Sequence, residues 1–219
     1  MSNTTPTKLV LAAYHESGHT VVAKLVQKPI TNIILRTDPT EDWGGEANYN
    51  PFSGIDSAWE MLDLDRHIPY RTLSLPYPGH LYPEDKYKYV RDFCAINYAG
   101  LAAEHLLYEQ LGILEKLALS EEDTFDIKQI KACIEAKFPT EEQEKEMRNA
   151  EVRARTILSN PICWRMVENL ANEMTDAVLH GKEPTKREYN GILLTEYKFD
   201  TSVIYASFAQ TIIGKRQLS

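Results

Sequence analysis

The sequence predicts a mainly α-helical, α+β domain with a small sheet near its N-terminus and a helical C-terminal half. Three observations support this fold class. An apolar helical pattern near the N-terminus must end before Pro29, because the residue preceding a proline is pushed out of the helical region. Two short segments rich in β-branched residues and glycine come next. From Glu84 onward, helical periodicity and helix-start signals dominate.

Length and composition favour one soluble domain that spans residues 1–219. The net charge of -8 argues against a nucleic-acid partner, because phosphate binding needs a basic face. Three widely spaced cysteines without a C-x-x-C pair indicate reduced thiols rather than a disulfide framework. The sequence has no apolar run long enough to span a membrane and no secretory signal, so we expect a cytoplasmic protein.

The N-terminal third is predicted to hold one helix and two strands. Thr5 is expected to cap the helix, with Pro6 at its first position and Val26 near its end. The β-branched segment at 30–37 is predicted to be a strand, and a second strand is expected around 43–50.

The middle of the chain is rich in proline and aromatic residues. We interpret residues 51–80 as an insertion, with a short helix expected around 55–64. Its Gly and Ser content is low, which is not typical of a flexible linker.

The C-terminal half carries repeated helix-start signals. A Ser or Thr is followed three residues later by an acidic or amide residue, the capping-box pattern, at 120, 140 and 185. Asn160 and Pro161 form another start signal. The expected helices therefore span about 84–112, 120–137, 140–158 and 160–181, with a short one opening at 185. The last segment, FDTSVIYASFAQTIIG, fits a strand or a helix equally well.

The stretch AAYHESGHTVVAKLV places two histidines and a glutamate on the first helix. His15 and His19 are four residues apart, so both project from one helix face and could bind one metal ion. In a metallohydrolase, Glu16 would lie beside the remaining metal position and take a proton from water. The same residues could instead form a buried, hydrogen-bonded polar cluster. Gly18, unfavourable inside a helix, indicates that something passes close to the backbone there.

A catalytic zinc site needs a third protein ligand. Glu104, on an otherwise apolar helical stretch, and Asp126, near a helix start, are the candidates. Either carboxylate could equally face solvent or stabilise a helix N-terminus.

Several stretches, in the same order, resemble the peptidase domain of the FtsH-type ATP-dependent zinc proteases. They cover most of residues 8–195. AAYHESGHTVVA resembles the zinc helix of that family, and ITNIILRT followed by WGGEA resembles its strand ending in arginine, here Arg36. YPEDKYKYVRDFCAINYAGLAAEHLL, EEDTFDIKQIKA and the segments AEVRARTIL, MVENLANEM and GKEPTKREYNGIL are similar to the helices that follow.

This resemblance implies a helical zinc-peptidase domain with a small edge sheet near the zinc helix. It implies His15, His19 and Asp126 as Zn²⁺ ligands and Glu16 as general base. Glu104 would orient a ligand histidine, or replace Asp126 as ligand.

The chain also departs from the family pattern. Ala99, Gly100 and Leu101 stand where the family has a glycine pair and an arginine. The ATPase module and membrane helices that precede the peptidase domain in the family are missing from this sequence, so we expect action on flexible or unfolded polypeptides, with a separate ATPase as a possible supplier of unfolded substrate. A homo-oligomer is compatible with the sequence.

The resulting functional hypothesis is a zinc metalloendopeptidase that hydrolyses unfolded or flexible polypeptides. The substrate would lie along an edge strand formed by Ile33, Ile34 and Leu35 or by Gly44 and Gly45. The alternative is an inactive binding or scaffold protein on the peptidase fold. A third hypothesis is a zinc hydrolase that acts on something other than peptides.

Overall fold

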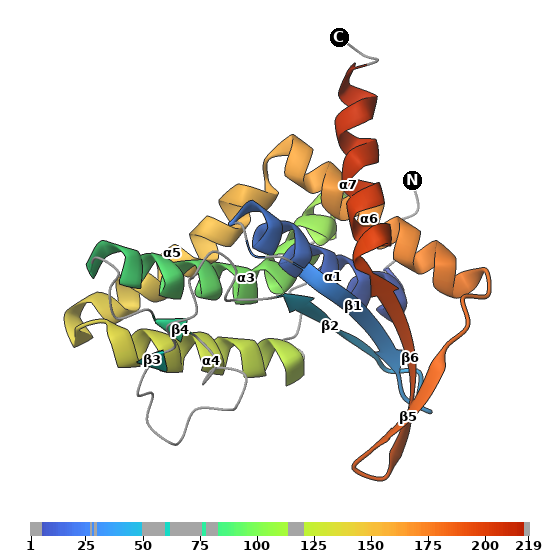
Figure 1. Cartoon of the computed structure of the whole chain (residues 1–219), viewed down its shortest axis with the longest axis horizontal. Helices are drawn as coiled ribbons and strands as arrows, with labels where there is room; N and C mark the ends of the chain where they lie inside the picture. The colour runs from blue at the N-terminus through green and yellow to red at the C-terminus, as the bar shows by residue number, and fades with distance from the viewer. Residues whose placement is uncertain are drawn as a thin grey trace.

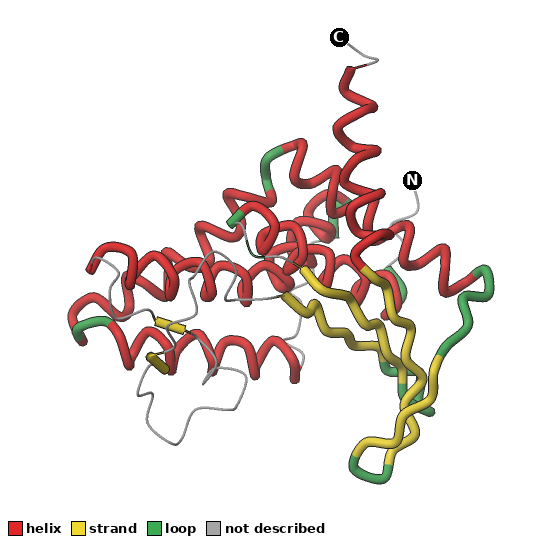
Figure 2. Tube along the Cα trace, in the orientation of Figure 1, coloured by secondary structure: helices red, strands yellow, loops and turns green. Residues whose placement is uncertain are grey.

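The computed structural model describes residues 6–26, 28, 30–49, 60–61, 76–77, 83–113 and 121–216. The described chain is a mixed α+β protein in which helices predominate (Figures 1 and 2). Its helices are α1 (Lys8–Leu25), α3 (Pro83–Gln110), α4 (Glu121–Lys137), α5 (Thr140–Leu158), α6 (Pro161–Leu179) and α7 (Thr201–Arg216). Its strands are β1 (Ile30–Thr37), β2 (Trp43–Tyr49), β3 (Glu60–Met61), β4 (Pro76–Tyr77), β5 (Thr185–Tyr189) and β6 (Ile192–Asp200).

The main sheet has the strand order β2-β1-β6-β5, and all its pairs are antiparallel. It combines strands from both ends of the sequence, because the C-terminal hairpin β5–β6 joins the N-terminal hairpin β1–β2 (Figure 2). Ile33 and Leu35 of β1 and Phe199 of β6 are almost fully buried, and Ile33 lies opposite Phe199. These side chains make one face of the sheet part of the core.

Helix α1 is the central element of the core. Every residue from Ala12 to Ala23 is buried, and α1 contacts α3, α6 and β2. The approach to α3 is close at Gly18, where an added Cβ would lie 2.3 Å from the carbonyl oxygen of Ala99 and 2.8 Å from the Cβ of Ala103. Gly18 therefore allows two helix backbones to pack together, as its position inside a helix indicated.

The first helix and the first two strands form as predicted, with one correction. The N-cap of α1 is Thr7, whose Oγ1 accepts a hydrogen bond from Val10 N at 3.3 Å, and not Thr5. Pro6 consequently precedes the cap instead of occupying the first helical position.

The four long helices predicted after Glu84 are confirmed as α3, α4, α5 and α6. Asn160 caps α6 by accepting a hydrogen bond from Ile162 N at 2.9 Å, as expected. The capping box predicted at Thr140 is wrong: the N-cap is Pro139, and Gln143 donates its side-chain hydrogen bond to the carbonyl of Phe138. The capping box predicted at Ser120 lies outside the described residues.

The short helix predicted at Thr185 is wrong, since residues 185–189 form strand β5. Asn190 and Gly191, with φ values of 51° and 79°, make the tight turn that leads into β6. The ambiguous last segment begins as the end of β6 and continues as α7. Asp200 separates the two by accepting a hydrogen bond from Ser202 N at 2.9 Å.

The proposed insertion at 51–80 lies outside the described residues except for β3 and β4. These two-residue strands pair with each other. The helix expected at 55–64 is wrong at Glu60–Met61, which form β3, and its other residues are not described. Within the described ranges, no helix has both the length and the apolar character needed to cross a membrane.

Candidate metal centre

His15 and His19 project from one face of α1 towards α3, as their spacing predicted. The Nδ1 atom of His15 lies 2.9 Å from Glu104 Oε1, and Nδ1 of His19 lies 2.6 Å from the carbonyl oxygen of Ile96. Ile96, Gly100 and Glu104 follow one another at intervals of four residues, so a single face of α3 meets both histidines. Both histidines are buried, with exposed fractions of 5% for His15 and 8% for His19.

These hydrogen bonds assign the ring protons of both histidines. A backbone carbonyl only accepts, so Nδ1 of His19 carries its hydrogen, and a carboxylate oxygen of Glu104 as acceptor places a hydrogen on Nδ1 of His15 as well. A neutral imidazole has one N–H, so each Nε2 presents a lone pair. The two Nε2 atoms face each other at 2.9 Å. Two lone pairs at this distance repel unless a cation lies against both.

That cation is either a proton held between the rings or a metal ion. Burial, together with repulsion from a protonated His15, lowers the pKa of His19 to about 3, so a proton would have to be carried by His15, beside Glu104, rather than by His19. A metal ion suits the same donor set. Ligand histidines in metal sites commonly donate their second ring N–H to a carboxylate or a backbone carbonyl, and both arrangements are present here.

Gly100 provides the space that such an ion requires. A Cβ added at this position would lie 2.4 Å from Nε2 of His15 and 2.5 Å from Nε2 of His19. Any other residue would therefore fill the region into which both nitrogens point. The residues present thus fit a metal ion bound through the two Nε2 atoms.

Glu16 lies on a different side of α1, beneath strand β2. It is 2% exposed, and a Cβ added at Gly45 would lie 2.5 Å from its Cγ and 2.7 Å from its Oε1. Gly45 therefore allows the backbone of β2 to pass directly over the glutamate side chain. The carbonyl of Glu16 accepts a hydrogen bond from Thr20 Oγ1 at 2.7 Å within the helix.

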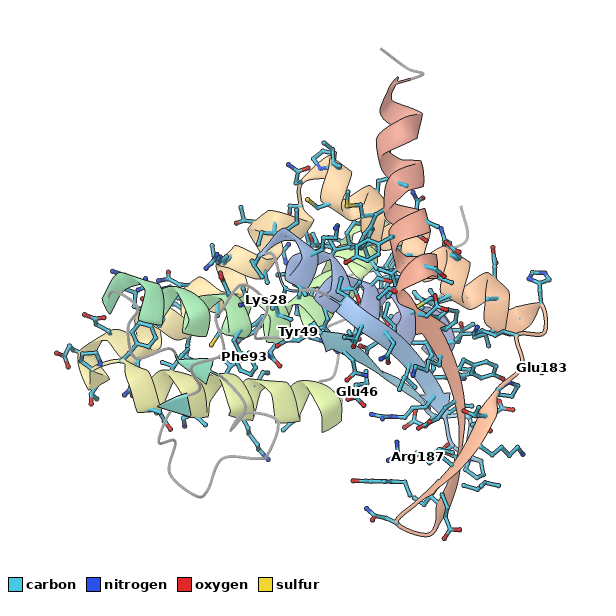
Figure 3. The ribbon with its side chains drawn as sticks, viewed as in Figure 1. Lys28, Glu46, Tyr49, Phe93, Glu183 and Arg187 are labelled. Atoms are coloured by element: carbon cyan, nitrogen blue, oxygen red, sulfur yellow. The ribbon has the colours of Figure 1, made fainter. Side chains whose placement is uncertain are left out.

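Strand β2 is an edge of the main sheet within the described part of the chain, where it pairs with β1 alone. Figure 3 shows Glu46 and Tyr49 along this strand. The expectation that Ile33, Ile34 and Leu35 form a substrate-binding edge is wrong, because β1 is hydrogen-bonded to β2 on one side and β6 on the other. Gly44 and Gly45, both in β2, keep that role as a hypothesis.

Glu104 and Asp126 are the two carboxylates considered as a third metal ligand. Glu104 contacts His15 through Nδ1, which is the position of an orienting residue and leaves the lone pair of Nε2 for a metal. Asp126 lies in α4, and its side chain is outside the described part of the structure. Among the described side chains, no group of three or more His, Cys, Asp or Glu residues is arranged to hold a metal ion.

Sequence reasoning missed two contributors to this site. The carbonyl of Ile96 has no side-chain signal, so only the tertiary structure could reveal it. Gly100 did carry a signal, since glycine inside a helix often marks a close approach to the backbone. Gly45 was expected in the substrate strand, but its contact with Glu16 was not predicted.

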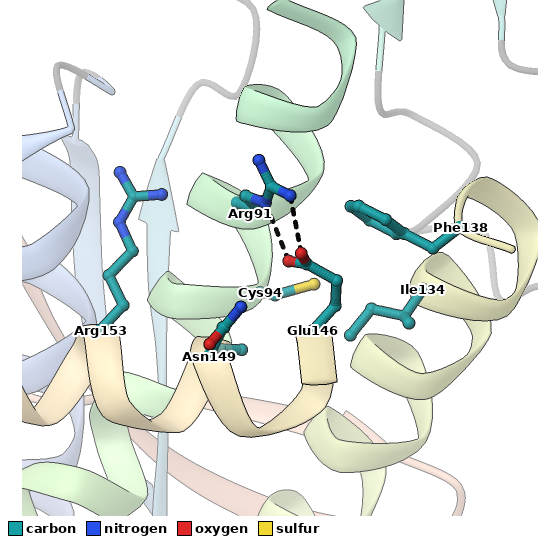
Figure 4. Close-up of a pocket in the computed structure, with 8 residues that line it drawn as sticks. Arg91, Cys94, Ile134, Phe138, Glu146, Asn149 and Arg153 are labelled. Carbon is teal, nitrogen blue, oxygen red and sulfur yellow. Dashed lines mark hydrogen bonds and ion pairs between the residues drawn. The ribbon is translucent and has the colours of Figure 1, made fainter. Parts of the chain in front are cut away.

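A small enclosed cavity of about 50 Å³ lies elsewhere, between α3, α4 and α5 (Figure 4). Its wall includes Arg91, which makes a two-point ion pair with Glu146 at 2.8 and 2.6 Å. The hydrogen bonds from Arg91 lower the pKa of Glu146, which is 5% exposed. Because both charges are paired, we interpret this cluster as a structural link between α3 and α5.

The fold and the site together define an α+β protein whose buried core helix carries a histidine pair that faces α3 and a glutamate that faces β2. In comparisons with protein-family models, curated proteins and solved structures, the chain matches none of them.

Proposed function

We propose that this protein is a zinc-dependent metalloendopeptidase with an FtsH-like peptidase domain. The observation that carries the proposal is the 2.9 Å approach of the His15 and His19 Nε2 atoms, with each Nδ1 held by a hydrogen-bond acceptor. An H-E-x-x-H helix with this arrangement is typical of zinc hydrolases. The FtsH-like order of the sequence segments favours peptides as the substrate.

Each residue of the site has a distinct role in this mechanism. His15 and His19 hold the metal through Nε2, while Glu104 and the carbonyl of Ile96 fix the orientation of the two rings. When bound, zinc supplies Lewis-acid polarisation of a carbonyl and makes water acidic enough to ionise near neutral pH. The carboxylate of Glu16 accepts the proton of the attacking water and delivers it to the leaving nitrogen.

The substrate would bind as an extended strand against the outer edge of β2, which pairs with β1 alone in the described part of the chain. Backbone hydrogen bonds would hold it independently of its sequence, which suits unfolded or flexible polypeptides. Gly45 supports this placement, because the strand passes over Glu16 there without a side chain between them. A separate ATPase that unfolds proteins would extend the activity to folded substrates.

Asp126 is our proposed third ligand. It belongs to α4, which packs against the same helix α3 that faces the histidines. If Asp126 is not the ligand, Glu104 is the replacement, and its hydrogen bond to His15 would then have to break.

Cleavage of an unfolded protein such as casein tests the proposal. The zinc-loaded protein should degrade casein, and Glu16→Gln should retain zinc while turnover falls by a factor of about 100 or more, because general-base catalysis is lost. Glu142→Gln, on the exposed surface of α5, is the matched control and should cleave as the wild type does.

Two results would contradict the proposed mechanism. Full activity in Glu16→Gln would exclude this residue as the base. Bound zinc without any turnover by the wild-type protein would favour the alternative, a binding or scaffold protein on the same fold.

A further inference from the structure

The hairpin β5–β6 presents an open strand edge far from the histidine pair. Its turn projects from the body of the molecule at the end opposite α7 (Figure 1). All five residues of β5 are exposed, and within the described chain β5 pairs with β6 alone. Large apolar side chains are exposed beside this edge, with Tyr189, Ile192 and Leu193 at 59%, 48% and 49%. The unpaired backbone N–H and C=O groups of an exposed strand edge are a template for pairing with another strand.

The order of charges along β5 specifies which strand fits. Lys186, Arg187 and Glu188 are consecutive, and Lys186 and Glu188 point to the same face of the sheet. When two copies of β5 pair antiparallel about a two-fold axis through Arg187, Lys186 of each copy lies opposite Glu188 of the other. Opposite charges in directly facing positions stabilise a strand pair.

We propose that β5 binds β5 of a second copy of this chain, which joins the two main sheets into one continuous antiparallel sheet. In this register all five residues of β5 are paired, since Thr185 then faces Tyr189 of the other copy. Tyr189 also lies diagonal to Arg187 of the second copy, within reach of a cation–π contact. The two Arg187 side chains face each other, and Glu196, 4.0 Å from Arg187 in the same chain, moderates their repulsion.

The neighbouring two-fold registers are unfavourable. A shift of the axis to Lys186 places two lysines opposite each other, and a shift to Glu188 does the same with two glutamates. Every one of these registers places one like-charged pair on the axis, Arg187 with Arg187 included, but only the register about Arg187 adds two Lys186–Glu188 pairs of opposite charge. Figure 3 shows Arg187 on this hairpin, away from the helices.

A charge-swap series tests the interface by sedimentation over a range of protein concentrations. The wild type should associate into dimers. Lys186→Glu and Glu188→Lys should each weaken dimerisation by about tenfold or more, because two facing pairs become repulsive. The double variant K186E/E188K restores both pairs and should recover the wild-type association. All three changes are on exposed side chains, so the fold should be retained.

A cross-linking experiment checks the register independently. Arg187→Cys places two thiols opposite each other at the two-fold axis and should give a covalent dimer on mild oxidation. Val152→Cys, 61% exposed on α5, is the control and should remain monomeric under the same conditions. A wild type that stays monomeric at high concentration would overturn the proposal, as would dimers that are insensitive to both single charge reversals.

Discussion

The Nε2 atoms of His15 and His19 lie 2.9 Å apart in the core, while each Nδ1 is held by an acceptor on α3. This relationship determines the chemistry of the site. With the hydrogen of each neutral ring on Nδ1, the two Nε2 lone pairs converge and suit a bound cation, and burial lowers the pKa of His19 and so disfavours a proton on that ring. The proposed zinc site thus rests on hydrogen-bond geometry as well as on the H-E-x-x-H spacing.

Gly100→Ala should reduce zinc affinity by at least about tenfold. The new Cβ would lie within 2.5 Å of both Nε2 atoms and force the rings away from their acceptors. Isothermal titration with zinc measures the effect. Wild-type affinity in this variant would show that the metal does not bind between these nitrogens.

Gly18→Ala should act on stability rather than on the metal. Its Cβ would lie 2.3 Å from the carbonyl oxygen of Ala99, a backbone atom that no rotamer change can move. We expect a loss of about 2–3 kcal/mol in the free energy of unfolding, measured in urea. A variant as stable as the wild type would mean that α1 and α3 can separate without cost.

Gly45→Ala should impair cleavage while zinc binding is retained. The added methyl group would lie 2.5–2.8 Å from atoms of the Glu16 side chain and displace its carboxylate. Casein turnover and zinc content are measured on the same sample. Val152→Ala, on the exposed surface of α5, is the control and should keep its activity. Equal activities of the two variants would argue against Glu16 acting beneath β2.

The ion pair between Arg91 and Glu146 should make stability depend on pH. The pKa of Glu146 is lowered from its ordinary value of 4.5, so its contribution is complete above that pH and is lost as pH falls through the folded-state pKa. Glu146→Gln should cost about 1–2 kcal/mol at neutral pH, since Arg91 is partly exposed. The difference from the wild type should shrink in acid. Urea unfolding at several pH values tests this, and a constant difference would contradict it.

Local patterns predicted much of this fold. The spacing of His15 and His19 was enough to place both rings on one face of α1, and the cap at Asn160 was read correctly. The helix predicted from Thr185 and Glu188 was wrong because the capping-box pattern also occurs by chance in exposed strands. Asn190-Gly191, a strong hairpin signal, decided the local structure there.

The rest of the site depends on contacts between distant segments. Gly100 and Ile96 lie more than seventy residues from the histidines, and no local periodicity relates them to α1. Similarly, β1 became an interior strand because β6, from the other end of the chain, pairs with its second edge. Within the described residues, this pairing leaves β2, rather than β1, at the edge of the sheet.

The zinc content of the purified protein, measured by mass spectrometry after zinc loading and desalting, tests the central claim most directly. We expect one zinc per wild-type chain, loss of that zinc in His15→Ala and His19→Ala, and full retention in His180→Ala, a change at an exposed histidine at the end of α6. A wild-type protein that binds no zinc, or a His19→Ala variant that keeps its full zinc content, would contradict this claim.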